Sequence, residues 1–172
     1  SVSRSAIPFQ AVNDDTGAWQ NFRMGEWYSP TRTRYRWRSW PAPKFLQDKG
    51  IKDSFSPPEL KNYPVQGTGG EFVQAILGLL WRQFIKMDFY GGQAFLVNTV
   101  HDCVWVDCHK DVLDQVAYDM KRIMESIPEF YNERYNMNIT VPFPVEVECG
   151  PNMNKLKHWH PGEPAWHHKM AA

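Results

Sequence analysis

The residues best placed to perform chemistry are His101 and Asp102, which stand between two apolar runs within residues 94–108. Both runs are rich in β-branched and aromatic residues, and this predicts a β-hairpin whose tight turn carries the two polar side chains. A carboxylate at the tip of a rigid hairpin can bind a metal ion without being buried among apolar groups. The alternative is an ordinary Asp turn, in which the carboxylate hydrogen-bonds its own backbone.

A second candidate site is a run of arginines in which every other residue is basic. If this run forms a strand, its period of two places the four guanidinium groups on one face. Guanidinium groups match phosphate oxygens, so the run predicts contacts with a nucleic-acid backbone. The alternative is a strand face that is solvated or paired with acids elsewhere. The four residues are Arg32, Arg34, Arg36 and Arg38.

The 172 residues suggest one domain, or one substantial piece of a larger protein. The formal net charge is +0, but residues 1–61 carry 10 basic and 6 acidic side chains, a balance of +4. The basic segment suits a polyanion, and the remaining chain supplies acids. The aromatic content of 15%, with 8 Trp, exceeds what a small core needs and predicts an interface.

Three cysteines without close spacing argue against a disulfide framework or a cysteine-based zinc site. We therefore expect a reducing setting inside the cell, in the cytoplasm. No apolar run approaches the ~20 residues that cross a bilayer, and the N-terminus has no signal-peptide pattern, so no membrane partner is expected.

Hydrophobic periodicity predicts the elements that position these residues. Trp19 and Phe22 are expected to anchor a short helix, and residues 67–70 a compact turn. From Glu71 an apolar stripe predicts a helix that Gly91 and Gly92 end. After the hairpin, a second amphipathic helix opens at residue 110 and stops at Pro128.

The remaining chain predicts a strand over residues 141–149, whose valines and glutamates alternate, after a short helix or irregular excursion over 129–140. Helix, hairpin, helix and strand in this order predict an α+β fold with one sheet face covered. The expected organisation is a basic, loop- and hairpin-rich segment (1–61), a portion carrying the hairpin (62–157) and a His-rich polar tail (158–172).

Three of these segments together resemble the C-terminal part of family A DNA polymerases, especially those of bacteriophages. Residues 62–68 (NYPVQGT) resemble the family's NxPxQGT segment. Residues 100–102 (VHD) resemble motif C on a palm hairpin, and residues 145–150 (VEVECG) resemble the terminal palm strand. The resemblance covers roughly residues 62–157; the arginine segment before it resembles, more loosely, the hairpin that follows the fingers.

The resemblance implies a partial polymerase palm, with Asp102 as the catalytic metal ligand and a fingers-derived segment before it. The implied cofactor is Mg²⁺ in a two-metal site, and the implied substrates are primer–template DNA and a dNTP. Asn62, Gln66 and His101 would meet the duplex near the growing end; for Asn62 and Gln66 the alternative role is hydrogen bonding at a helix start.

Two departures from the family's pattern bear on activity. Cys103 occupies the position where motif C usually continues with Glu, and a thiol is a poor Mg²⁺ ligand. The chain also contains no motif A and no fingers motif B. We therefore expect one chain of a split polymerase, inactive alone, whose partner chain carries motif A and the fingers and completes the metal site.

Two other functions remain open. In the first, the chain is a palm remnant that binds DNA or a partner without catalysis. In the second, it is an unrelated α+β metal-dependent hydrolase that uses His101, Asp102 and histidines of the tail. Imidazoles suit zinc, but the spacing of the tail histidines matches no zinc motif, so an ordinary polar tail is favoured. The tail histidines are His158, His160, His167 and His168.

Overall fold

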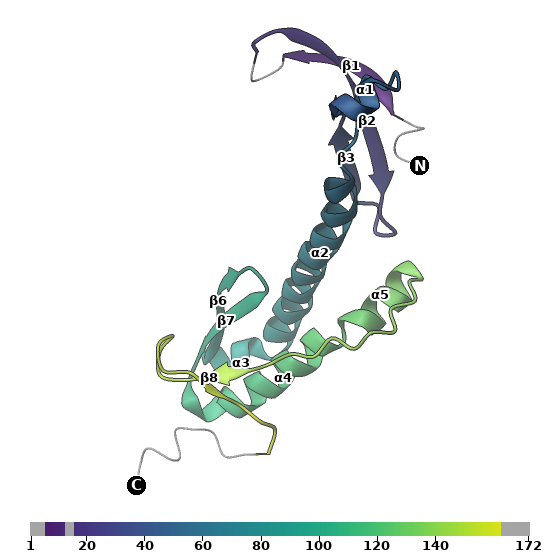
Figure 1. Cartoon of the computed structure of the whole chain (residues 1–172). Coiled ribbons are helices and arrows are strands. Elements are labelled where there is room, and N and C mark those ends of the chain that lie inside the picture. The colour runs from purple at the N-terminus through teal and green to yellow at the C-terminus, as the bar shows by residue number, and fades with distance from the viewer. Residues whose placement is uncertain (1–5, 13–15, 163–172) are drawn as a thin grey trace. The chain divides into compact units, whose positions relative to one another are not determined.

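The computed structural model describes residues 6–12 and 16–162 (Figure 1). The chain forms two compact units, Ser1–Gly69 and Gly70–Ala172, and the boundary falls inside one long helix. Each unit mixes helices and strands, so the described chain is α+β in composition. The palm assignment remains a prediction.

The first unit contains a three-stranded antiparallel sheet in the order β1-β2-β3, formed by β1 (Ile7–Val12), β2 (Trp19–Tyr28) and β3 (Arg34–Arg38). The helix expected around Trp19 and Phe22 is therefore wrong. β2 is the central strand, and Phe22 pairs with Phe9 of β1, with ring centroids 5.7 Å apart. Cross-strand pairing, which local periodicity does not reveal, decides this segment.

The core of this unit lies against the Tyr35 and Trp37 side of β3. Tyr35 and Trp37 of β3 pack with Phe55, and the Trp37 indole donates a hydrogen bond to the Glu59 carbonyl. The connection after β3 contains β4 (Trp40–Pro41), α1 (Lys44–Gln47) and β5 (Asp53–Ser54), with β4 paired to β5. An ion pair of 2.8 Å between Arg23 and Asp53 ties this connection to β2.

The long helix α2 (Pro57–Lys86) begins fourteen residues before the Glu71 start that the sequence predicts. Residues 67–70, expected to form a turn, are helical. Glycine lowers helix propensity, but at Gly67 a Cβ atom would lie 2.1 Å from the Tyr35 hydroxyl. The glycine thus serves close packing of the helix on the sheet and does not mark a turn.

In the second unit, α3 (Asp88–Gly92) joins α2 to the hairpin of β6 (Ala94–Val100) and β7 (Cys103–Cys108). The predicted hairpin is confirmed, with Val100 paired to Cys103 across the turn. The predicted end of the preceding helix at Gly91 and Gly92 is wrong, because α2 ends at Lys86.

The segment α3 is one left-handed turn, since all five residues have positive φ, from 49° at Asp88 to 74° at Gly92. Left-handed backbone costs a non-glycine residue ~1–2 kcal/mol, so tertiary contacts must hold it. The Tyr90 ring is buried against Phe84 at 5.2 Å, and its hydroxyl donates to Asp119 at 3.0 Å. Burial and the Asp119 carboxylate raise the pKa of Tyr90, which keeps this donor protonated.

Behind the hairpin, the chain forms η1 (Lys110–Val112), α4 (Leu113–Glu125) and α5 (Ile127–Tyr135). The helix predicted after the hairpin is confirmed, although Pro128 lies in the first turn of α5. Pro fits there because the first helical N–H groups lack helical partners. Buried Leu80, Ile123 and Ile127 form the centre of the core between α2, α4 and α5.

The strand predicted over residues 141–149 is wrong for most of its length. Only β8 (Glu148–Cys149) is a strand, and it pairs with β9 (Lys157–His158). The side chains still alternate, with Val145 and Val147 partly buried and Glu146 exposed. The predicted alternation of buried and exposed side chains is therefore present, but residues 141–147 are not part of a strand. No described helix is long and apolar enough to cross a membrane.

Candidate functional site

His101 and Asp102 form the two-residue turn of the β6–β7 hairpin, as the sequence predicts. His101 has a φ of 55°, the left-handed conformation that tight hairpin turns require and that His adopts more readily than most residues. Both side chains are exposed. The hairpin therefore presents a solvent-accessible carboxylate at the tip of a paired element.

The hairpin itself is fixed to the core on one side. Ala94 is fully buried, and Leu96 and Val106, which pair across the strands, pack against the buried cluster that contains Phe84 and Tyr90. A register shift between Leu96 and Asn98 makes a bulge at position 97. Bulges re-aim side chains and recur beside active sites, but the sequence carries no local signal for this one.

The described residues do not complete a metal site around Asp102. They contain no group of three His, Cys, Asp or Glu side chains that could hold a metal ion. Asp107 lies opposite Phe95 near the base of the hairpin, and Asp111 lies 3.4 Å from His109. Asp102 thus offers one carboxylate ligand, and a Mg²⁺ site would need further ligands from outside the described chain.

Asn62 and Gln66 lie four residues apart on α2, so both face the same side of the helix, and both are exposed. Because α2 begins at Pro57, neither residue sits at the helix start, and the alternative of start-of-helix hydrogen bonding is excluded for them. They belong to the first unit, whereas His101 and Asp102 belong to the second. Their predicted duplex contacts remain predictions.

The arginine run is only partly the ribbon that the sequence predicts. Arg34, Arg36 and Arg38 share one face of β3, but Arg32 lies in the turn before it with a φ of 67°. The Arg36 guanidinium donates to Glu26 at 2.8 Å. Arg38 lies 4.4 Å above the Trp40 ring and 4.8 Å from the Phe22 ring. The pairing with acids that the sequence left open therefore applies to Arg36.

The His-rich tail lies only partly within the described residues. His158 of β9 is 3.9 Å from Glu148, and His160 is exposed. His167 and His168 lie outside the described residues.

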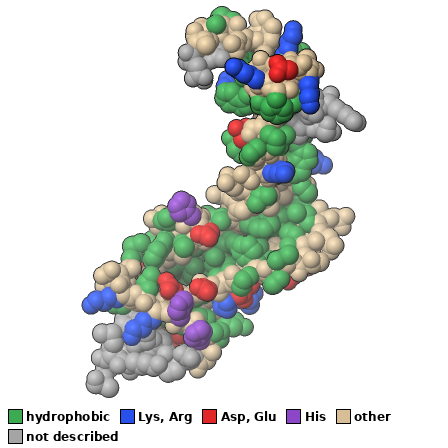
Figure 2. Space-filling view, viewed as in Figure 1, with side chains coloured by type: hydrophobic (Ala, Val, Ile, Leu, Met, Phe, Trp, Pro, Cys, Tyr) green, Lys and Arg blue, Asp and Glu red, His purple; other side chains and the backbone are tan. Residues whose placement is uncertain are grey.

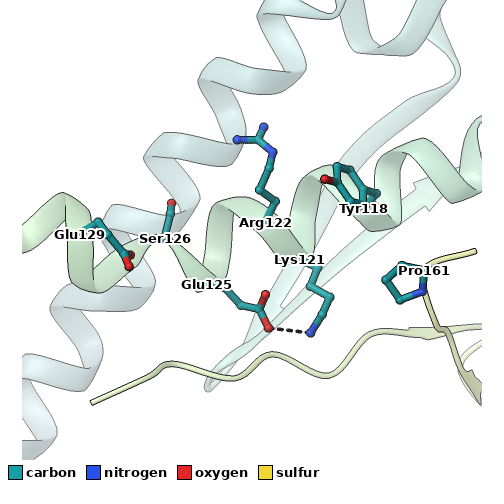
Figure 3. A pocket seen from close by; sticks show the side chains of 7 residues that line it. All are labelled: Tyr118, Lys121, Arg122, Glu125, Ser126, Glu129 and Pro161. Carbon is teal, nitrogen blue, oxygen red and sulfur yellow. Dashed lines mark hydrogen bonds and ion pairs between the residues drawn. The ribbon is translucent and has the colours of Figure 1, made fainter. Parts of the chain in front are cut away.

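One surface pocket lies along α4 and does not include any predicted site residue (Figure 3). Two of its lining residues interact: Lys121 donates to Glu125 at 2.6 Å, and Lys121 also donates to the Val145 carbonyl. Glu125 in turn accepts the Val145 N–H at 3.2 Å. The Lys121 ammonium lowers the pKa of Glu125. These bonds attach the segment before β8 to α4, so the structure assigns them a positioning role.

All three cysteines are free thiols. Burial raises the pKa of Cys149 to about 11, and burial also raises the pKa of Cys108. Both thiols are therefore protonated at neutral pH and suited to packing. Cys103, next to Asp102, is exposed.

Comparison with known proteins finds two DNA polymerases that are similar to about half of the chain. The chain is 38% identical over 91 residues to a DNA polymerase of Bacillus phage SP01, and 32% identical over 87 residues to DNA polymerase I of Aquifex aeolicus. About half of this chain is similar to DNA polymerases. The matches cover 53% and 51% of the chain but only 9% and 13% of those two proteins. No protein-family model and no solved structure matches the chain.

Proposed function

We propose that this chain is the C-terminal palm portion of a family A DNA-directed DNA polymerase, a nucleotidyltransferase of DNA replication. The observation that carries the proposal is Asp102, held exposed at the hairpin tip in a chain similar to two DNA polymerases. In this proposal Asp102 is a metal ligand, and His101 meets the primer–template duplex beside it. The substrates are primer–template DNA and a dNTP.

The proposal includes a second chain that carries motif A and the fingers. One exposed carboxylate is too few for Mg²⁺, which binds several oxygen ligands, so the remaining carboxylates would come from that partner. When bound, Mg²⁺ would activate the primer hydroxyl and neutralise phosphate charge. The contribution of this chain is to hold Asp102 on a rigid turn, because the bulged hairpin is fixed to α2 and α4 through its buried face.

Replacement of Asp102 tests the proposal directly in the assembled enzyme. Asp102→Asn keeps the shape of the side chain but removes the charge, so the single-turnover rate is expected to fall by orders of magnitude while DNA affinity is retained. Cys103→Ala provides the neighbouring control and is expected to have little effect. Cys103→Glu introduces a possible oxygen ligand and is expected to keep or raise the rate.

Near-normal turnover of Asp102→Asn would make Asp102 an ordinary turn residue and would refute the proposed function. A second candidate function, a palm remnant that binds DNA without catalysis, is favoured by the incomplete ligand set and by Cys103. It predicts that no partner chain restores primer extension and that both Cys103 variants remain inactive.

A further inference from the structure

We propose that one face of the sheet in the first unit binds single-stranded DNA, with unpaired bases stacked on Tyr28 and Trp40. The choice of DNA rests on the proposed function, whereas the binding mode rests on the sheet itself. The face is defined by three cross-strand pairs, in which neighbouring side chains lie on the same side. These pairs are Tyr28 with Arg34, Glu26 with Arg36, and Met24 with Arg38.

Two aromatic rings are exposed at the two ends of this arginine face. Tyr28 is 54% exposed, and its side chain makes no hydrogen bond or ring contact within the described residues. Trp40 is 44% exposed, and its ring contacts the Arg38 guanidinium. By contrast, Tyr35 and Trp37 on the opposite face are buried in the core. The exposed rings are thus available to a ligand, while the buried rings stabilise the fold.

The charges on this face fit a polyanion. Glu26, its acidic residue, is neutralised by Arg36, and Arg34 forms no ion pair in the part of the chain that the structure describes. Of the four acids in the described first unit, Glu26 and Asp53 are already in ion pairs with arginines. Lys and Arg side chains gather on this unit in Figure 2. Phosphates would therefore meet cations with little acidic repulsion.

The combination of rings and guanidinium groups favours a single strand over a duplex. Duplex bases hide their flat faces in the stack, whereas single strands expose them to aromatic side chains. The Arg34 and Arg38 backbones are ~13 Å apart along β3 at ~3.3 Å per residue, enough for a few nucleotides. Arg38 is also pre-oriented between the Phe22 and Trp40 rings.

The test is binding of the full chain to a fluorescein-labelled oligothymidine, followed by fluorescence anisotropy without metal or partner. Tyr28→Ala and Trp40→Ala should each weaken binding by about 5- to 100-fold, the range for loss of one stacked base. Tyr28→Phe and Trp40→Phe keep a ring and should retain most of the affinity. Arg34→Ala should flatten the dependence of log affinity on log salt by about 0.7, as for one phosphate contact on a single strand.

Trp19→Ala is the matched control, because Trp19 lies on the opposite face of β2 and is 72% exposed. Its affinity should equal that of the wild type. Absence of oligothymidine binding, an equal loss in Trp19→Ala, or equal losses in the Ala and Phe variants would each overturn the inference. So would a hairpin duplex that competes as well as the single strand. The proposed polymerase activity is tested separately at Asp102, so the two can fail independently.

Discussion

Gly67, which lies in the segment 62–68, allows helix α2 to pack closely on Tyr35 of the sheet. A Cβ there would meet the Tyr35 hydroxyl at 2.1 Å and its ring carbon Cε1 at 2.5 Å. Tyr35 is buried between Trp27 and Trp37, with ring centroids at 5.6 Å and 6.2 Å, so its ring has little room to move. The backbone of α2 approaches the sheet closely only because residue 67 has no side chain.

We expect Gly67→Ala to destabilise the protein by about 1–3 kcal/mol through overpacking, measured as a lower midpoint of urea unfolding by tryptophan fluorescence. The control is Gly69→Ala, two residues on in the same helix, where a Cβ meets nothing within 4 Å. Helix propensity predicts a gain of up to about 1 kcal/mol there. Tyr35→Phe in the Gly67→Ala background should recover part of the loss; identical unfolding of the two glycine variants would contradict the packing role.

Residue types predicted the candidate site better than they predicted its surroundings. The placement of His101 and Asp102 in a hairpin turn followed from local alternation, which is a short-range property. The arginine run was harder, because the turn at Arg32, the ion pair of Arg36 and the ring contacts of Arg38 depend on β2 and β4. The other ligands of the proposed metal site could not be predicted from this chain, which holds one carboxylate at the hairpin turn.

At the scale of elements, the left-handed turn α3 links α2 to the hairpin. It reverses the chain within five residues, so the position of β6 depends on its conformation. Its aromatic residues anchor it to both neighbours: Phe89 contacts Trp81 of α2 and Phe95 of β6, each at 5.7 Å between ring centroids. Hydrophobic periods of 3.6 or 2 residues cannot predict such a turn. The sequence pattern therefore predicts only a helix that ends at the glycines.

Gly92→Ala is expected to destabilise the second unit by about 1–2 kcal/mol, because φ is 74° there and no atom lies within 4 Å of the added Cβ. Gly78→Ala, in the regular part of α2 and equally free of neighbours, should instead stabilise by up to about 1 kcal/mol. Thermal unfolding followed by circular dichroism compares the two. A stabilising Gly92→Ala would show that the left-handed turn does not form in solution.

The bonds that join Lys121 and Glu125 of α4 to Val145, in the segment before β8, give a prediction about the pH dependence of stability. Lys121 lowers the pKa of Glu125 below its ordinary value of 4.5, so the carboxylate stabilises the folded state above that value. This contribution is lost as the pH falls through the lowered pKa. Because the Glu125 side chain is 37% exposed, solvent screening keeps the effect below about 1 kcal/mol.

Between pH 7 and pH 3 the wild type should therefore lose more stability than Glu125→Gln, measured by urea unfolding at each pH. Glu129→Gln is the control, since Glu129 is exposed and forms no ion pair in the described part of the chain. Its loss of stability over this range should match that of the wild type. If stability fell with pH in the same way in all three proteins, the Lys121–Glu125 pair would not contribute to the pH dependence.

For the whole molecule, the exposed apolar surface of the second unit is the feature that a partner chain would explain. Trp81, Ile85, Phe95 and Val97 are each 48–59% exposed, and the ring of Phe89 joins Trp81 to Phe95. A connected apolar strip of this kind is typical of a protein interface. It runs from α2 to the base of the hairpin whose turn carries Asp102, so a partner bound there would contact the element that holds the proposed metal ligand.

We expect the chain alone to be inactive in primer extension with Mg²⁺ and to gain activity when a chain carrying motif A and the fingers is added. Trp81→Ser combined with Phe95→Ser should raise the partner concentration needed for half-maximal extension at least tenfold, because interface aromatics carry much of the binding energy. Tyr118→Ser, a 53% exposed aromatic on α4, should leave that concentration unchanged. Sedimentation velocity measures the same association without DNA. Extension by the chain alone, or equal losses in the two variants, would show that Asp102 does not depend on a partner docked on this strip.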